Sequence, residues 1–315
     1  MKILAVDDDP IILALLNQVL QVAGFKNLTV CESAERAIEL IHNANVPFDC
    51  FLLDIQMPVT DGIQLTSAIR NMPAHTKTPI LMITAMSDRT YIDAAFAAGA
   101  SDYITKPFEI SEIHSRLRLI EELVAKRKQS EDRNPVASKH GPAETIGVDS
   151  MRERWAPTDI DNVIDYLALE NYLVQVSRSP LVDLQVFGVV VPDMEQMFLA
   201  SSQYEYQSAV SDIAWAISDS LKPLEFFIAH AGAGEFVVVL KEGGSLDAQD
   251  YQAGLREKLS ALKLHYCDGR PMSLQPIAGQ PRSLQRESVR AGTNTLAQAL
   301  EDASYSAEQR RSTPR

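Results

Sequence analysis

Residues 48–62 read FDCFLLDIQMPVTDG, and this stretch decides the fold of the first part of the chain. Its apolar run, residues 48–54, does not alternate with polar residues, which is typical of a strand that is covered on both faces in a parallel sheet. The run ends in Asp54, and a helical pattern begins near Gly62. The stretch therefore predicts one strand–helix unit with a carboxylate at the end of the strand.

The same unit recurs along residues 1–120. Apolar runs at residues 2–6, 27–31, 48–54, 79–84 and 102–105 alternate with helical patterns that begin near Pro10, Ser33, Gly62, Asp88 and Glu109. Five repeats of this kind predict a doubly wound α/β fold, in which helices cover both faces of a five-stranded parallel sheet.

The composition excludes several classes of protein. The chain has 315 residues, of which 46% are hydrophobic and 23% charged, and a formal net charge of −13. This charge argues against nucleic acid or an anionic membrane as the main partner, because both select basic surfaces. No stretch approaches the ~20 apolar residues of a membrane helix, and acids directly follow the short apolar start, unlike a signal peptide. The three cysteines lack metal-ligand spacing and suit a reducing compartment, so we expect a cytoplasmic protein.

The pattern changes after a first domain at residues 1–127. Residues 128–157 are polar and rich in Ser, Pro and Gly, which predicts a flexible linker. A second domain follows at residues 158–315, with helices expected at about 163–176, 203–221, 247–263 and 295–310 and strands at 184–191, 224–230, 236–240 and 272–278. Such helices beside adjacent antiparallel strands predict an α+β domain of the ferredoxin-like type.

Polar side chains follow the expected strands of the first domain at the points where the strands end. Asp7, Asp8 and Asp54 supply carboxylates, and Thr84 and Lys106 supply a hydroxyl and a cation. The ligand site of a doubly wound sheet lies at the carboxyl ends of its strands, so we expect these side chains to gather there. Carboxylates that gather repel one another unless a hard cation neutralises them, and Mg²⁺ prefers oxygen ligands. A carboxylate in such a site can be a nucleophile toward phosphorus, with donors on the oxygens that move.

The acids after the first strand also fit a plainer role as a helix cap. Asp9 directly precedes Pro10, and proline is favoured at the first helical position. Alone, the run of three aspartates leaves both interpretations open. We assign the cap to Asp9 and the cation to Asp7 and Asp8, because several motifs in order favour the site.

Four motifs resemble the response-regulator receiver domain of two-component signalling and occur in its order: VDD (6–8), LLDIQMPVTDG (52–62), ITA (83–85) and DYITKPF (102–108). The resemblance implies the flavodoxin-like fold and a phosphoacceptor at Asp54. It also implies Mg²⁺ as the cofactor, with Asp8 and Asp54 as ligands, Asp7 acting through water, and the backbone carbonyl of Gln56 completing the set.

The same resemblance assigns roles at the last two strands. Thr84 and Lys106 would bind the phosphoryl group, Tyr103 would be a rotameric switch, and Lys106–Pro107 would be a cis peptide bond. Each residue has an alternative, because a threonine can simply end a strand and an aromatic residue on a last strand often only packs.

Residues 230–240 read HAGAGEFVVVL, a small-residue turn between two apolar strands, which predicts a hairpin. Together with the strand ahead of PDMEQMF (192–198) and the ending LAQALEDASYSAEQRR (296–311), this hairpin distantly resembles the GGDEF domain of diguanylate cyclases. That family condenses two GTP molecules into cyclic di-GMP. The resemblance implies a nucleotidyl-cyclase-like fold over residues 158–311.

Most of the cyclase site is missing from this sequence. Gly232 and Glu235 persist, and Asp193 aligns with one metal-binding carboxylate, although an acidic turn after a strand is the favoured interpretation. Gly234 stands where the family has its second metal-binding carboxylate, and Glu308 stands where it has a phosphate-binding lysine. A carboxylate that faces phosphate is repelled by a few kcal/mol near a protein surface, so we expect a degenerate domain without activity.

These features predict a two-component response regulator that signals through an inactive second domain by binding another protein. The expected partners are a sensor histidine kinase or phosphotransfer protein and a downstream protein. The family's guanine-reading residues fall near Ser201 and Val210, which also argues against catalysis. Two alternatives stay open: a cyclase with residual activity, and a receptor for cyclic di-GMP or GTP.

The last helix of the first domain carries a further pattern. Ile113, Leu117, Ile120 and Val124 follow one another at alternating steps of four and three, the spacing of a coiled-coil seam. We expect Ile113 and Leu117 to cover the sheet instead, whereas Ile120 and Val124 lie near its end. A phosphorylation-dependent homodimer along this helix is therefore a hypothesis, with intramolecular release of the second domain as its alternative.

Overall fold

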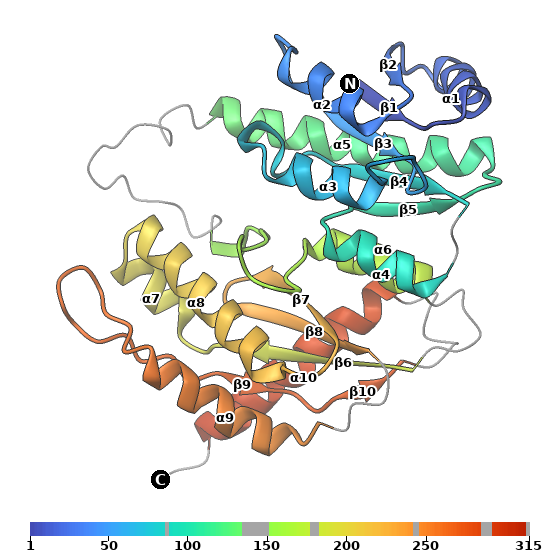
Figure 1. Ribbon diagram of the computed structural model, residues 1–315. Helices are drawn as coiled ribbons and strands as arrows, with labels where there is room; N and C mark the ends of the chain where they lie inside the picture. Colours follow the sequence, from blue (N-terminus) through green and yellow to red (C-terminus); the bar gives the residue numbers. More distant parts are fainter. Residues whose placement is uncertain (86–87, 134–150, 177–182, 242–245, 285–291, 313–315) are drawn as a thin grey trace. The chain divides into compact units, whose positions relative to one another are not determined.

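The computed structural model describes residues 1–85, 88–133, 151–176, 183–241, 246–284 and 292–312. The chain divides into two compact units, residues 1–141 and residues 142–315. In each unit a sheet is packed against helices (Figure 1).

The first unit is built on a five-stranded parallel sheet in the order β2-β1-β3-β4-β5, which confirms the predicted doubly wound fold. Its strands are β1 (Lys2–Val6), β2 (Asn27–Cys31), β3 (Cys50–Leu53), β4 (Ile80–Thr84) and β5 (Asp102–Thr105). Its helices are α1 (Pro10–Val22), α2 (Ala34–His42), α3 (Gly62–Arg70), the short 3₁₀ helix η1 (Pro73–His75), α4 (Arg89–Ala97) and α5 (Ile110–Arg133).

Side-chain caps fix where the helices of the first unit begin. Asp9, Ser33 and Asp88 each accept a hydrogen bond from a backbone N–H of the first turn of α1, α2 and α4. Asp61 and Gln64 form a reciprocal capping box at α3. Each cap satisfies an amide that the helix itself leaves without a partner, so every strand passes to its helix at a defined residue. The capping role predicted for Asp9 is confirmed.

The predicted seam on α5 is wrong as a pairing surface. Ile113 and Leu117 are fully buried, Ile120 is only 6% exposed, and all three belong to the hydrophobic core that α1 and α5 form with the sheet. Val124 packs against the same core. Ile113 and Leu117 thus cover the sheet as expected, Ile120 does so too, and the half-buried Val124 is the one partly accessible residue of the four.

The second unit contains an antiparallel sheet in the order β10-β6-β8-β7, with β9 also paired to β6. Its strands are β6 (Leu184–Val190), β7 (Phe226–Gly232), β8 (Glu235–Lys241), β9 (Ile277–Ala278) and β10 (Arg282–Ser283). Its helices are α6 (Tyr166–Val176), α7 (Met194–Ala200), α8 (Gln203–Leu221), α9 (Ala248–Ala261) and α10 (Gly292–Ser312). The unit is therefore of the α+β class.

Alternate residues of these strands face different helices. Phe187 of β6 lies edge-on to Tyr251 of α9, in the core that α8 and α9 share with the sheet. The next residue, Gly188, faces α10, where a Cβ atom would lie 2.4 Å from the backbone oxygen of Ala299. This glycine lets α10 approach the strand closely.

Two expectations for the second domain are corrected. The strand predicted at 272–278 is reduced to Ile277–Ala278, because Pro276 has no N–H to donate to a ladder. The helix predicted from residue 163 begins at Tyr166, since Val163 instead bridges to Ile228 of β7.

The flanks of the predicted linker are also ordered. Helix α5 continues to Arg133, and Met151, at 6% exposed, belongs to the core of the second unit. Residues 134–150 lie outside the described residues.

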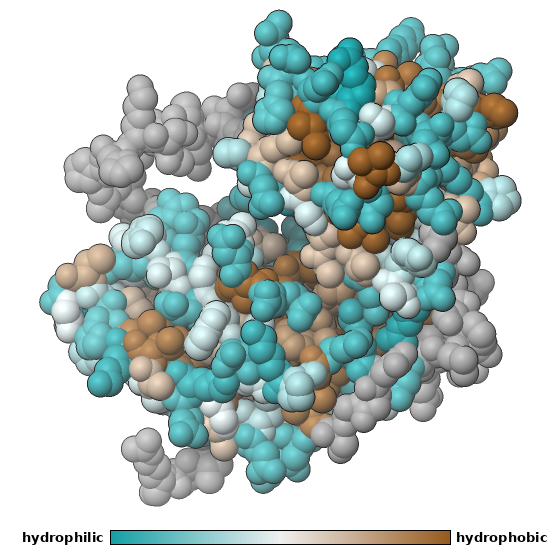
Figure 2. Space-filling model, in the orientation of Figure 1, coloured by the Kyte–Doolittle hydropathy of each residue, from teal (hydrophilic) through white to brown (hydrophobic). Residues whose placement is uncertain are grey.

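Hydrophilic side chains cover most of the face that Figure 2 shows, with small apolar patches among them. Within the described ranges, no helix is both long enough and apolar enough to cross a bilayer.

Candidate functional site

Three carboxylates gather at the carboxyl edge of the parallel sheet. Asp7 and Asp8 follow β1, and Asp54 follows β3, its neighbour in the sheet. One carboxylate oxygen from each lies within 4.8 Å of the others. Asp7 and Asp54 are buried, whereas Asp8 is exposed. Among the residues that the structure describes, this acidic trio is the one group of three or more His, Cys, Asp or Glu side chains placed to share a metal ion.

Lys106 brings a positive charge to this trio from the end of β5. Its Nζ donates to Asp7 Oδ2 at 2.6 Å and lies 3.4 Å from Asp54 Oδ2. Burial, the largest cause, raises the pKa of Asp7, while Lys106 lowers it and the neighbouring charge of Asp54 raises it further. The cis peptide bond predicted at Lys106–Pro107 is present. A single ammonium thus faces two buried carboxylates, and the cluster keeps an excess of negative charge.

The donor set fits the cation that the sequence predicted. Mg²⁺ binds one or two carboxylates and keeps several of its waters. The trio offers carboxylate oxygens from two strand ends, and Asp8 is exposed to the solvent that would supply those waters. The Gln56 side chain is exposed, and the role of its backbone carbonyl stays a prediction.

Asp54 is held in one orientation by its own turn. Its Oδ1 accepts a hydrogen bond of 2.9 Å from the backbone N–H of Ile55, and its Oδ2 is the oxygen that faces Lys106. The backbone N–H of Asp54 donates to Val6 O at 2.9 Å, which ties this turn to β1.

Thr84 and Tyr103 lie on neighbouring strands, β4 and β5, and both side chains are fully buried. The backbone N–H of Lys106 donates to Thr84 O at 2.7 Å, so the residue that carries the ammonium is fixed directly to the end of β4. Burial, with a smaller contribution from the charge of Asp54, raises the pKa of Tyr103. The structure thus brings Thr84 and Lys106 together at the end of two adjacent strands, and the switching role of Tyr103 stays a prediction.

Sequence reasoning missed one residue of this site, Gly62. A Cβ atom on Gly62 would lie 1.9 Å from the backbone oxygen of Asp54, so no larger residue fits without moving the acceptor turn. Its N–H also donates to Ile55 O at 2.9 Å. The signal was in the sequence, because a glycine directly after a helix-capping Asp and close behind a site carboxylate indicates a close backbone approach.

Four residues of the predicted cyclase site, Asp193, Gly232, Gly234 and Glu235, lie at one end of the antiparallel sheet. Gly232, Ala233 and Gly234 turn the β7–β8 hairpin with positive φ angles of 96°, 53° and 73°. The N–H of Val191 donates to Gly234 O at 3.1 Å, which places the residues after β6 beside the turn. Asp193 is exposed, has a left-handed backbone conformation and is the residue directly before α7. Glu235 is half-buried and is the first residue of β8.

The space beside Gly234 is filled. A Cβ atom at this position would lie 2.2 Å from Cγ of Met194, a side chain only 3% exposed. A carboxylate could not project from residue 234 without displacing Met194. Glu308 belongs to α10, and its side chain lies outside the described residues.

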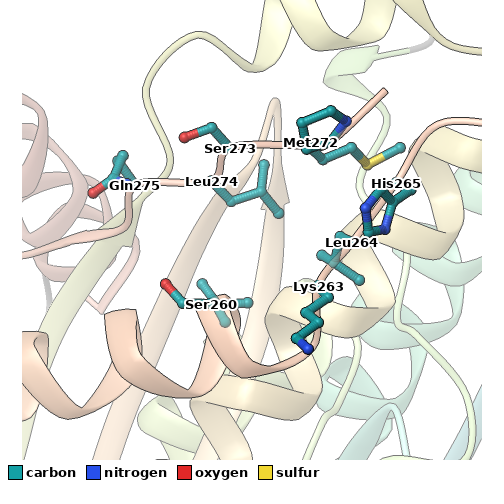
Figure 3. Close-up of a pocket in the computed structure, with 10 residues that line it drawn as sticks. Ser260, Lys263, Leu264, His265, Met272, Ser273, Leu274 and Gln275 are labelled. Carbon is teal, nitrogen blue, oxygen red and sulfur yellow. The ribbon is translucent and has the colours of Figure 1, made fainter. Parts of the chain in front are cut away.

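A pocket of ≈ 330 Å³ opens elsewhere in the second unit, at the end of α9 (Figure 3). It is lined by Ser260 on α9 and by residues of the following loop, among them Lys263, His265 and Met272. None of the residues predicted for the cyclase site is among its lining residues. No sequence pattern marked this loop as a site.

Comparison with known proteins identifies the first unit. The family model of the response regulator receiver domain matches residues 3–118. The transcriptional regulatory protein PrrA of Mycobacterium tuberculosis is 31% identical over 188 residues, 58% of this chain and 77% of that protein.

Two further relatives match over shorter stretches. The transcriptional regulatory protein CpxR of Escherichia coli is 37% identical over 119 residues, 38% of this chain and 48% of that protein. The signal transduction histidine-protein kinase BarA of Escherichia coli is 35% identical over 117 residues, 37% of this chain but only 12% of the kinase.

Solved structures also align with part of the chain. The chemotaxis protein CheY4 of Vibrio cholerae, 29% identical, gives a TM-score of 0.36 and covers 38% of this chain and 97% of that one. A putative response regulator of Chloroflexus aurantiacus, 38% identical, also gives 0.36 and covers 38% of this chain and 95% of that one. At TM-scores this low the overlap carries no argument about the fold.

Proposed function

Because this chain belongs to the response-regulator family, we propose that it accepts a phosphoryl group on Asp54 and signals through its second unit by binding another protein. The observation that carries the proposal is the acidic trio of Asp7, Asp8 and Asp54 with Lys106 at its edge. The donor is the phosphohistidine of a sensor kinase or phosphotransfer protein.

Each residue has a defined task in the transfer. Oδ2 of Asp54 attacks the phosphorus while Oδ1 is held by the Ile55 N–H. The bond from phosphorus to the donor nitrogen breaks, and the donor histidine keeps the electron pair. Lys106, 3.4 Å from the attacking oxygen, and the Thr84 hydroxyl then hold the phosphoryl oxygens.

Mg²⁺ bound at the acidic trio would supply positive charge to the oxygens that move. Asp8 and Asp54 would hold it directly and Asp7 through water. Lys106 also limits the repulsion between the buried carboxylates before transfer, since its Nζ already bonds to Asp7.

We propose a degenerate GGDEF-like domain as the output. The order of β9, β6, β8 and β7, with α8 between β6 and β7 and α9 between β8 and β9, supports a ferredoxin-like arrangement. Two observations support the loss of catalysis. Met194 fills the space beside Gly234, and Val210, at a position expected to read guanine, is fully buried.

The rival functions predict different results. A cyclase with residual activity would need a second carboxylate beside Asp193, where Met194 now packs. A receptor for cyclic di-GMP or GTP would give heat on titration with the nucleotide. We expect no cyclic di-GMP by chromatography after incubation with GTP and Mg²⁺ or Mn²⁺, and no calorimetric signal with either nucleotide. Product at ordinary enzyme rates would restore the cyclase, and saturable heat would favour the receptor.

We further propose restoration variants as a stricter test. The double variant Gly234→Asp with Glu308→Lys should stay inactive, because the new carboxylate would collide with Met194.

The names of PrrA and CpxR describe those proteins as transcriptional regulators. For this chain the net charge of −13 favours a protein partner over nucleic acid, and a cytoplasmic location stays an expectation.

Phosphorylation in vitro tests the proposed function. Acetyl phosphate with Mg²⁺ should load one labile phosphoryl group per chain, and an excess of EDTA should prevent it. Equal loading with EDTA would contradict the role of the acidic trio as a Mg²⁺ site. A homodimer on phosphorylation stays a hypothesis, and since the seam on α5 is buried it would need another surface.

A further inference from the structure

A short segment ahead of α6 lies across the tip of the β7–β8 hairpin, and we call residues 151–155 the strap. The carbonyl of Met151 accepts a hydrogen bond of 2.8 Å from the backbone N–H of Ala233 and another of 3.3 Å from the Tyr206 hydroxyl. The Met151 side chain is buried in the core of the unit. The strap is thus anchored at the centre of the hairpin turn.

The hairpin turn is shaped to receive the strap. A Cβ atom on Gly232 would lie 2.5 Å from the backbone oxygen of Arg152, so only glycine leaves room for the strap at this point. At the other end, the ring of Trp155 lies edge-on to His230 of β7, with centroids 5.6 Å apart. Contacts at Met151, Arg152 and Trp155 therefore hold the strap along its length.

Arg154 of the strap is exposed and lies over an aromatic ring of α6. Its guanidinium carbon lies 4.0 Å from the centre of the buried Tyr166 ring. Two half-buried carboxylates, Glu170 of α6 and Glu235 of β8, are close enough for their charges to interact with that of Arg154. Burial raises the pKa of both carboxyls, and the charge of Arg154 acts in the opposite direction on each.

We propose that Tyr166, Glu170 and Glu235 form an arginine-recognition site, filled by the strap and taken by an arginine-bearing segment of a partner protein when the strap leaves. A planar guanidinium lies flat on an aromatic face while its fork of N–H donors points outward to carboxylates, whereas an ammonium is a compact point charge without this planar fork. That the second occupant is a partner protein rests on the proposed function, in which the second unit signals by binding another protein. The site itself does not, because Arg154 already occupies it.

The first test asks whether the strap is docked. Gly232→Ala forces a Cβ atom against Arg152 O in a turn with φ of 96°. Gly269→Ala is the matched control, since Gly269 has φ of 85° and nothing within 4 Å of the added atom. We expect Gly232→Ala to raise the rate of tryptic cleavage after Arg152, and the rate of hydrogen exchange at the Ala233 amide, by about tenfold or more. The control should change each rate by less than about twofold. Equal effects of both variants would overturn docking of the strap.

The second test asks what the site recognises. The probe is a fluorescent peptide of residues 151–158, MRERWAPT, and its control carries Arg154→Gln. Met151→Asp in the full chain loosens the strap by placing a charge in the core. We expect the arginine peptide to bind this chain about tenfold or more tightly than it binds the unaltered chain, because the strap no longer competes.

The carboxylates give the remaining arms of this test. The control peptide should bind the opened chain about tenfold or more weakly than the arginine peptide does. Adding Glu170→Gln and Glu235→Gln to the opened chain should weaken binding of the arginine peptide by a similar factor. If Met151→Asp lowers the cooperativity of unfolding, the Arg154→Gln chain replaces it, since this change empties the site and keeps the anchor. Equal binding of the two peptides, or no binding to the opened chain, would overturn the proposal. Neither arm uses phosphorylation, so failure at Asp54 would be seen separately.

Discussion

Gly62 shows how closely one residue can determine the geometry around the proposed phosphoacceptor, Asp54. Its missing Cβ is what lets the start of α3 lie against the backbone oxygen of Asp54. The Asp54 carboxylate owes its orientation to the same turn, through the N–H of Ile55. The position of this carboxylate therefore depends on a residue that carries no functional group.

Gly62→Ala should damage both stability and phosphorylation. The added Cβ would lie 1.9 Å from Asp54 O, so we expect the first unit to lose about 2–4 kcal/mol of unfolding free energy in urea, and loading from acetyl phosphate to slow. Gly254→Ala in α9 is the control, since nothing lies within 4 Å of its added atom. Unchanged unfolding and loading in Gly62→Ala would refute the steric account.

His230 gives the second unit a predicted dependence on pH. Its ring is 1% exposed between Trp155 and Phe236, and burial lowers its pKa to about 4, with the Trp155 backbone acting weakly in the other direction. The unfolded chain takes up a proton near the ordinary histidine pKa of about 6.5, whereas the folded chain does not until lower pH. Stability is therefore lost as the pH falls from about 6.5 toward 4, at up to about 1.4 kcal/mol per pH unit.

The measurement is urea unfolding of the second unit at several pH values between neutral and 4.5. His230→Phe keeps an aromatic ring and removes the titration, so its unfolding free energy should depend less on pH across this window. Parallel pH profiles for the two proteins would show that the histidine does not titrate as described.

At the scale of elements, Arg70 fastens the end of α3 to two loops. Its guanidinium donates to the backbone oxygens of Gly99, His75 and Thr78 at distances between 2.7 and 2.9 Å. These bonds join the C-terminus of α3, the turn before β4 and the turn before β5, which carries Lys106 at its far end. The sequence showed only a basic residue in the last turn of a helix.

Arg70→Ala should cost about 2–3 kcal/mol of unfolding free energy in the first unit, because several charge-assisted hydrogen bonds are lost at once. The control is Arg36→Ala, whose side chain is 60% exposed and pairs with Glu39 one turn away. That exposed pair should be worth no more than about 0.5 kcal/mol. Urea midpoints that shift equally in both variants would contradict the special role of Arg70.

Strand and helix patterns could be predicted where burial dominates. The strands of the first unit were found because four of the five apolar runs are almost wholly covered, β2 being the partly exposed exception. The caps at Asp9, Ser33 and Asp88 mark helix starts. The strand expected at 272–278 failed because Pro276 interrupts its ladder. Residues 151–155 were assigned to a linker because local composition does not show that Met151 enters a core formed by distant residues.

At the scale of the whole molecule, the first unit gathers three carboxylates and an ammonium at one sheet edge, whereas in the second unit a buried methionine packs beside the hairpin turn. The acidic trio could be predicted because strand ends of a parallel sheet meet at one edge. The filling of the hairpin by Met194, and the place of Arg154 over Tyr166, depend on contacts between segments far apart in sequence. No local pattern encodes those contacts.

The central claim is that Asp54 accepts the phosphoryl group, and intact-protein mass spectrometry after treatment with acetyl phosphate and Mg²⁺ tests it most directly. The account predicts one phosphoryl group on the unaltered chain and on Asp9→Ala, whose side chain only caps α1. It predicts strongly reduced loading in Asp8→Ala, some loading in Lys106→Ala, and none in Asp54→Ala. Loading that persists in Asp54→Ala would contradict the account.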